Sequence, residues 1–209
     1  NQFLSEIEPS RAPGTVSYLH VLLPHSPYVF DETGRVHRAP PRGRWKDKSE
    51  YVTLLRNYKR QVRFLDRLLG RFIAKLEAAG LYEKSIIVVT SDHGFTSFRD
   101  FAPPEVVDGI EINNARPRVP LIVHAPQLRP GVSTTDYQHV DFKGTVLALL
   151  GMNGDPGTPS AFAPHPARPK VFCDGGVWYV GGPDGSWAPK QDESEQIGCG
   201  ASVLSDSKP

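Results

Sequence analysis

Lys84 to Phe98 read KSIIVVTSDHGFTSF, an apolar run that ends in Ser-Asp-His-Gly. The run from Ile86 to Thr90 is continuous and rich in β-branched residues, which is typical of a strand buried on both faces. Asp92 and His93 follow this run directly, before a glycine. The stretch therefore predicts a strand whose carboxyl end presents a carboxylate and an imidazole side by side.

Two further apolar runs have the same character. Thr15 to Leu23 reads TVSYLHVLL between Pro-Gly and another proline, and Val119 to His124 reads VPLIVH. Ahead of the Asp-His stretch, Ser49 to Ala79 repeat apolar side chains at spacings of three and four, which predicts a long amphipathic helix. We expect Ser49 to cap this helix and Gly80 to end it.

A second helix is predicted from Asp141 to Leu150, with Asp141 as its cap and Gly151 at its end. Buried strands that alternate with helices predict an α/β fold with a mostly parallel sheet flanked by helices. Such sheets bind ligands beyond the carboxyl ends of their strands. His25, in the PHSPY that follows the first run, is therefore expected to lie close to Asp92 and His93.

The sequence predicts three parts. Residues 1–151 form the α/β domain, residues 152–169 are a linker rich in proline and glycine, and residues 170–209 form a short tail with a β-hairpin. Cys173 and Cys199 both lie in this tail. They either form a disulfide, which requires an oxidising compartment, or are two reduced thiols.

Composition excludes several classes of protein. The chain has 209 residues with 24 Lys or Arg against 23 Asp or Glu, so neither disorder nor nucleic-acid binding is indicated. No window approaches 18 uninterrupted apolar residues. We expect this chain to be soluble by itself.

The neighbouring Asp92 and His93 offer an oxygen and a nitrogen ligand suited to Ca²⁺, Mg²⁺, Mn²⁺ or Zn²⁺. The alternative is that Asp92 caps a turn and His93 is merely packed. His25 stands between two prolines, which restrict its backbone, and is suited to contact an anionic ester. The alternative interpretation of His25 is an ordinary histidine in the turn that follows a strand.

Four motifs follow one another in the order and spacing of a known family: LHVLLPHSPY, RFLDRLLGRFIAKLEAAGLYEKSIIVVTSDHG, RVPLIVHAP and HVDFKGTVLALLG. Residues 15 to 151 thereby resemble the sulfatase branch of the alkaline phosphatase superfamily. The resemblance is strongest to the extracytoplasmic sulfatase-like domains of bacterial membrane proteins.

The resemblance implies that Asp92 and His93 are divalent metal ligands and that His25 contacts the ester of the substrate. Asp66 and Asp141 match recurring family positions, to which we assign structural roles. Arg99 and Asn114 fall in stretches that resemble family segments beside the site, and we assign them no role.

The chain departs from the family in one respect. An acidic metal ligand and a nucleophile, which precede these motifs in the family, have no counterpart here, so we assign no catalytic residue within the chain. We expect it to be the C-terminal half of the domain, inactive by itself and binding metal weakly or not at all.

The parent protein is then expected to be a metal-dependent hydrolase or transferase of sulfate or phosphate esters at the cell envelope. Transmembrane helices before the domain would anchor it there. The alternative is a non-catalytic module that binds an anion, senses metal or serves as an interaction domain.

Overall fold

The computed structural model describes residues 7, 14–37, 48–95, 106–107, 110–111, 117–152, 159–163, 166, 168–174, 177–182 and 187–189. The chain divides into two compact units, Asn1–Ser85 and Ile86–Pro209.

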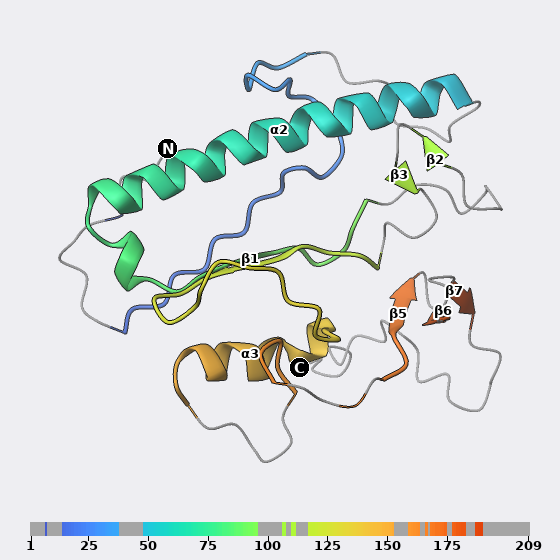
Figure 1. Ribbon diagram of the computed structural model, residues 1–209. Coiled ribbons are helices and arrows are strands. Elements are labelled where there is room, and N and C mark those ends of the chain that lie inside the picture. The colour runs from blue at the N-terminus through green and yellow to red at the C-terminus, as the bar shows by residue number, and fades with distance from the viewer. Residues whose placement is uncertain are drawn as a thin grey trace, which may run out of the picture. The chain divides into compact units, whose positions relative to one another are not determined.

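The first unit is built on one long helix, α2, Lys48–Ala78 (Figure 1). Gly80 ends it with a positive φ of 65°, and the N–H groups of Gly80 and Leu81 donate to the carbonyls of Glu77 and Leu76. This pair of bonds is the Schellman arrangement that glycine favours. The predicted helix and its end are confirmed, whereas Ser49 as cap is wrong because it is already helical.

One face of α2 is covered by the segment that follows His25. The ring of Tyr28 meets that of Tyr58 edge to face at 5.7 Å, and the rings of Phe30 and Phe64 lie 5.5 Å apart. Leu55 is completely buried on the same helix. A short helix, η1 (Tyr82–Lys84), follows α2.

The run from Thr15 to Leu23 is not assigned as a strand. Val16, Tyr18 and Leu22 are 86%, 87% and 75% exposed. A strand buried on both faces needs chain above and below it, and these side chains lack that cover here. The predicted buried strand is therefore wrong for this structure.

The second unit contains β1 (Ile87–Thr90) and β4 (Leu121–His124), at the two remaining apolar runs. The two strands pair antiparallel, with Ile87 opposite His124 and Thr90 opposite Leu121. This pair does not confirm the expected mostly parallel sheet. Apolar patterns predict that a segment is a strand, but its direction depends on the path of the connecting chain.

Two smaller features complete the middle of this unit. Strands β2 (Val106–Val107) and β3 (Ile110–Glu111) form an antiparallel pair. The 3₁₀ helix η2 (His139–Asp141) leads directly into α3 (Phe142–Leu149).

The end of α3 is as predicted, since Gly151 has a φ of 67° and its N–H donates to Ala148. Asp141 occupies the position before α3, but its side chain makes no capping bond to that helix. It accepts the N–H of Gln138 instead, over 2.9 Å, and so closes η2. The predicted cap is in the right position but stabilises the preceding turn.

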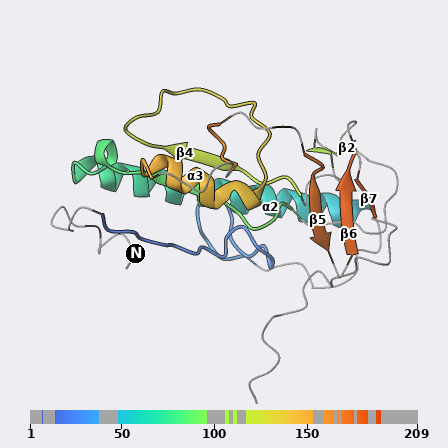
Figure 2. The ribbon, with the colours of Figure 1, turned by 90° about the horizontal axis from the view of Figure 1, so that it is seen from below.

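The tail forms a three-stranded antiparallel sheet of β5 (Val171–Asp174), β6 (Val177–Gly181) and β7 (Trp187–Pro189), seen side by side in Figure 2. The sequence predicted one hairpin, whereas β6 pairs antiparallel with both β5 and β7. Phe172 stacks on Tyr179, with ring centroids 4.9 Å apart.

The tail is also cross-linked. Cys173 is disulfide-bonded, whereas Cys199 lies outside the described residues. Of the two alternatives left open by the sequence, the structure therefore has the disulfide.

None of the helices described is both long enough and apolar enough to cross a membrane.

Candidate functional site

Asp92 and His93 lie in the loop that follows β1. The Oδ2 atom of Asp92 is 3.8 Å from the Nε2 atom of His93, and the two side chains are 85% and 39% exposed. If two donor atoms each lie about 2.1 Å from the same metal ion, they can be at most about 4.2 Å apart. The spacing of these two donor atoms therefore fits one shared cation.

The hydrogen bonds of His93 determine which ring nitrogen can bind a metal. Its Nδ1 atom lies 2.7 Å from the carbonyl oxygen of Gly94. A carbonyl oxygen only accepts, so Nδ1 carries the proton, and in the neutral ring Nε2 keeps its lone pair. A backbone carbonyl that receives the other ring N–H is the usual support of a metal-bound histidine.

The carboxylate of Asp92 has two roles. Its Oδ1 atom accepts the backbone N–H of His93 over 2.9 Å, while Oδ2 is the atom placed near Nε2. Within the described parts of the chain, no group of three or more His, Cys, Asp or Glu side chains is placed to hold a metal ion. The pair is suited to a metal as part of a larger ligand set.

His25 lies in the first unit, in the loop that precedes Tyr28. Its ring is exposed, and its Nδ1 atom lies 2.5 Å from the carbonyl oxygen of Ser26. As in His93, this leaves Nε2 as the outward atom of the ring. The expected closeness of His25 to Asp92 and His93 spans the two units and stays a prediction.

One residue of α2 that was not predicted from the sequence holds the His25 loop. Gln61 is completely buried; its Nε2 donates to the carbonyl of His25 over 2.9 Å, and its Oε1 accepts the N–H of Phe30 over 3.2 Å. Gln61 lies three residues after Tyr58 and four before Leu65, on the predicted apolar face. A glutamine on an otherwise apolar helix face was the sequence signal that could have indicated a buried hydrogen-bonding residue.

The loop continues into a tight acidic turn. The hydroxyl of Thr33 donates to Asp31 over 2.6 Å; this bond, with N–H donation from Arg35 and Thr33, lowers the pKa of Asp31 from 3.8 to about 2 against a smaller opposing effect of desolvation. Arg60 of α2 donates to Glu32 over 2.6 Å and lowers the pKa of that carboxyl as well.

The remaining predicted residues are less informative. Arg99 and Asn114 lie outside the described residues. Asp66 is an exposed residue of α2, so a structural role for its side chain is not supported there. Asp141, by contrast, is 1% exposed and lies in a polar cluster of the second unit.

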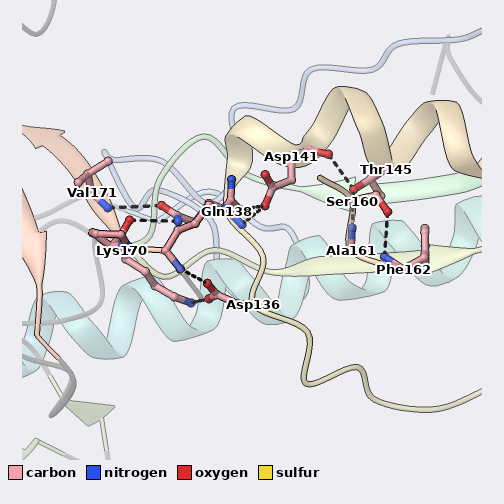
Figure 3. Close-up of polar contacts among 11 residues, drawn as sticks. Asp136, Gln138, Asp141, Thr145, Ser160, Ala161, Phe162, Lys170 and Val171 are labelled. Atoms are coloured by element: carbon pink, nitrogen blue, oxygen red, sulfur yellow. Dashed lines mark hydrogen bonds and ion pairs between the residues drawn. The ribbon is translucent and has the colours of Figure 1, made fainter. Parts of the chain in front are cut away.

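Figure 3 shows this cluster, in which the segment 136–141 holds the chain that enters β5. Arg168 donates to Asp141 over 2.6 Å, and Lys170 lies 2.7 Å from Asp136, whose pKa it lowers. Gln138 donates to the carbonyl of Pro169 over 3.3 Å and accepts the N–H of Val171 over 3.4 Å. The entry to the tail sheet is thereby fastened to η2.

Comparison with known proteins identifies several relatives. The chain is 34% identical over 102 residues to lipoteichoic acid synthase 1 of Bacillus subtilis (strain 168) and 37% identical over 103 residues to lipoteichoic acid synthase 2 of the same organism. Each match covers 46% of this chain and 16% of the relative.

A further relative is the multifunctional alkaline phosphatase superfamily protein PehA of Trinickia caryophylli. It is 27% identical over 146 residues, which are 66% of this chain and 27% of PehA. The chain thus spans about a sixth of the two synthases and about a quarter of PehA.

The family model described as Sulfatase matches residues 1–152. This range contains His25, Asp92, His93 and the four motifs that carry the resemblance. With the relatives named above, it confirms the resemblance to the sulfatase branch of the alkaline phosphatase superfamily. The chain belongs to the sulfatase family.

Proposed function

We propose that the whole protein containing this chain is a metal-dependent hydrolase or transferase that acts on sulfate or phosphate esters at the cell envelope. The observation that carries this proposal is the pair of donor atoms, Asp92 Oδ2 and His93 Nε2, 3.8 Å apart. Members of this family generally use a divalent metal ion. The pair combines the two ligand types that such an ion accepts.

Asp92 and His93 would hold the cation from the end of β1. A bound divalent cation would polarise the ester and neutralise its charge. His93 is kept in the required tautomer by Gly94, which receives its Nδ1 proton. These two residues supply part of a ligand set whose other members we expect elsewhere in the whole protein.

His25 would contact the ester oxygen through Nε2. Because Nδ1 is bonded to the carbonyl of Ser26, Nε2 is the ring atom left for substrate. Once it takes up a proton, Nε2 can donate to an anionic oxygen, and the Ser26 carbonyl then stabilises the positive ring. Gln61 and the loop it holds keep this ring at a fixed place on the first unit.

We further propose that Thr15 to Leu23 joins a mostly parallel sheet in the whole protein. The large exposed fractions of Val16, Tyr18 and Leu22 support this, since soluble proteins rarely leave a contiguous apolar run uncovered. The nucleophile would also lie on chain outside this one, and the match to 16% of each synthase leaves room for it there. This chain alone would then turn over no ester.

The names of the relatives bear on the reaction. Two are named as lipoteichoic acid synthases and one as an alkaline phosphatase superfamily protein. These names favour a phosphate ester over a sulfate ester as the substrate, and they are compatible with either transfer or hydrolysis as the reaction. The synthase names also support the envelope as the site of action, with membrane anchoring through other parts of the whole protein.

The metal assignment is tested by Asp92→Asn in the whole protein, with Asp66→Asn as the matched control on an exposed carboxylate of α2. A neutral amide is a poorer ligand for a hard cation. Metal content by elemental analysis and the rate on an aryl phosphate should both fall in Asp92→Asn and be unchanged in Asp66→Asn. Full metal content and full rate in Asp92→Asn would refute the assignment.

The ester assignment is tested by His25→Ala, with the exposed His20→Ala as control. His25→Ala should lower the rate and leave the metal content unchanged, because the ring is proposed to touch only the ester. A wild-type protein that binds metal and ester but turns over neither aryl phosphate nor aryl sulfate would instead support the non-catalytic module.

A further inference from the structure

The ring of His139, at the start of η2, contacts the end of β1. Its Nε2 atom lies 2.6 Å from the carbonyl oxygen of Ser91, 48 residues away in sequence, and 3.4 Å from the hydroxyl oxygen of Thr90. Both contacts lie within the second unit. Ser91 immediately precedes Asp92, so His139 reaches the backbone from which the proposed metal ligands project.

The direction of these bonds follows from the acceptors. The carbonyl of Ser91 only accepts, so Nε2 of His139 carries the proton. The hydroxyl of Thr90 donates its own proton to the carbonyl of Pro120 over 2.8 Å, which leaves its lone pairs for His139. The Nε2–H group of His139 therefore faces two oxygen atoms, the hydroxyl of Thr90 at the end of β1 and the carbonyl of Ser91 directly after it.

The bond to Ser91 fixes a specific part of the loop. The carbonyl of Ser91 and the N–H of Asp92 belong to the same planar peptide group. Holding that oxygen sets the orientation of the peptide from which the Asp92 side chain emerges. It thereby limits where the carboxylate can point relative to the ring of His93.

The support of His139 is itself firmly held. The neighbouring Gln138 and Asp141 close η2 with a capping box, and the ring of Tyr137 meets that of His139 edge to face at 6.0 Å. The buried carboxylate of Asp141 is in turn bonded to Arg168. Figure 3 shows how Asp136 and Gln138 hold Lys170 and Val171 of the chain entering β5.

We propose that His139 is a positioning residue for the metal-binding loop. It touches neither metal nor ester; it orients Asp92 and His93 through the carbonyl of Ser91. This inference rests on the proposed function, because it assumes that those two residues bind a cation. Since His139 is exposed, its replacement leaves no cavity and the effect of the lost bond can be measured directly.

The test compares His139→Leu with His139→Gln in the whole protein, using Mn²⁺ alone as the probe and its dissociation constant as the readout. Loss of a residue that supports ligands weakens metal binding by about 10- to 100-fold, and His139→Leu should do so. His139→Gln keeps an N–H donor of similar reach and should bind Mn²⁺ nearly as tightly as the wild type.

Two further variants separate the possible results. Leu149→Ala removes a buried side chain of α3 and should lower thermal stability without changing Mn²⁺ affinity. Equal losses of Mn²⁺ affinity in His139→Leu and Leu149→Ala, or in His139→Leu and His139→Gln, would overturn the positioning role. So would unchanged binding in His139→Leu when Asp92→Asn weakens it. Unchanged binding in Asp92→Asn itself would overturn the metal site and this inference with it.

Discussion

The side-chain amide of Gln61 donates a hydrogen bond of 2.9 Å to the carbonyl oxygen of His25, across 36 residues of sequence. The same amide accepts the N–H of Phe30, and Gln61 has no exposed surface. One side chain of α2 thus satisfies a backbone group at each end of the segment that carries His25.

Replacing Gln61 by Met should lower the free energy of unfolding. The new side chain has a similar volume but leaves the partly buried His25 carbonyl and Phe30 N–H without Gln61 as a partner, which costs up to about 1–3 kcal/mol. Urea denaturation measures the loss. Arg63→Met, at an exposed position of the same helix, should change stability by no more than about 0.5 kcal/mol. Equal effects of the two changes would contradict the bridging role.

Acid should weaken the turn that follows His25. The pKa of Asp31 is lowered from 3.8 to about 2, chiefly by the hydroxyl of Thr33. Because the folded pKa is the lower one, the contribution of Asp31 to stability is fully present above about pH 4. It is lost as the pH falls toward 2.

An NMR titration of the Asp31 carboxyl tests this assignment. Thr33→Val removes the hydroxyl but keeps the backbone N–H, so the pKa of Asp31 should rise toward its ordinary value. Thr53→Val, at an exposed site of α2, should leave the titration unchanged. A titration in Thr33→Val that matches the wild type would show that the hydroxyl is not the cause.

Features set by local sequence were predictable. The helix α2 and its end at Gly80, the helix α3 and its end at Gly151, and the strand before Asp92 all follow from periodicity and from glycine at a positive φ. The neighbouring Asp92 and His93 were visible for the same reason, since adjacency in sequence places both in one loop.

Features set by distant chain were not predictable. The antiparallel pairing of β1 with β4 depends on the connection between them, and the exposure of Thr15 to Leu23 depends on which chain covers it. The partners of Asp141 and His139 lie 27 and 48 residues away. No local spacing encodes such contacts, so these two residues appeared only as a helix cap and as part of a motif.

Gly34→Ala should destabilise the first unit by more than the cost of a left-handed backbone alone, because the new methyl group would also clash with Phe64. Gly34 has a φ of +86°, and an added Cβ would lie 2.5 Å from Cε2 of Phe64. Gly80 also has a positive φ, of +65°, but an added Cβ there meets nothing within 4 Å. Gly80→Ala should therefore cost about 1–2 kcal/mol for the left-handed backbone, and Gly34→Ala clearly more.

A double-mutant cycle isolates the clash at Gly34. In a Phe64→Ala background the ring atoms are gone, so the extra cost of Gly34→Ala over Gly80→Ala should disappear. The free energies of unfolding come from urea denaturation of the four proteins in the cycle. Additive effects of Gly34→Ala and Phe64→Ala would show that the ring does not limit this position.

Breaking the Arg168–Asp141 ion pair, which anchors η2, should lower the free energy of unfolding far more than breaking the more exposed Lys170–Asp136 pair. The side chain of Asp141 is 1% exposed and that of Arg168 is 30% exposed. Removing one partner of a buried ion pair costs about 3–5 kcal/mol. Because Arg168 is partly exposed, Arg168→Met should cost an amount at the lower end of that range or below it. Lys170 and Asp136 are 49% and 24% exposed, so Lys170→Met should cost at most about 1 kcal/mol. Adding Asp141→Asn to Arg168→Met should recover part of the lost stability in urea denaturation, because the double variant no longer leaves a buried carboxylate without its guanidinium. Equal losses in Arg168→Met and Lys170→Met, with no recovery in the double variant, would show that the Asp141 carboxylate does not depend on Arg168.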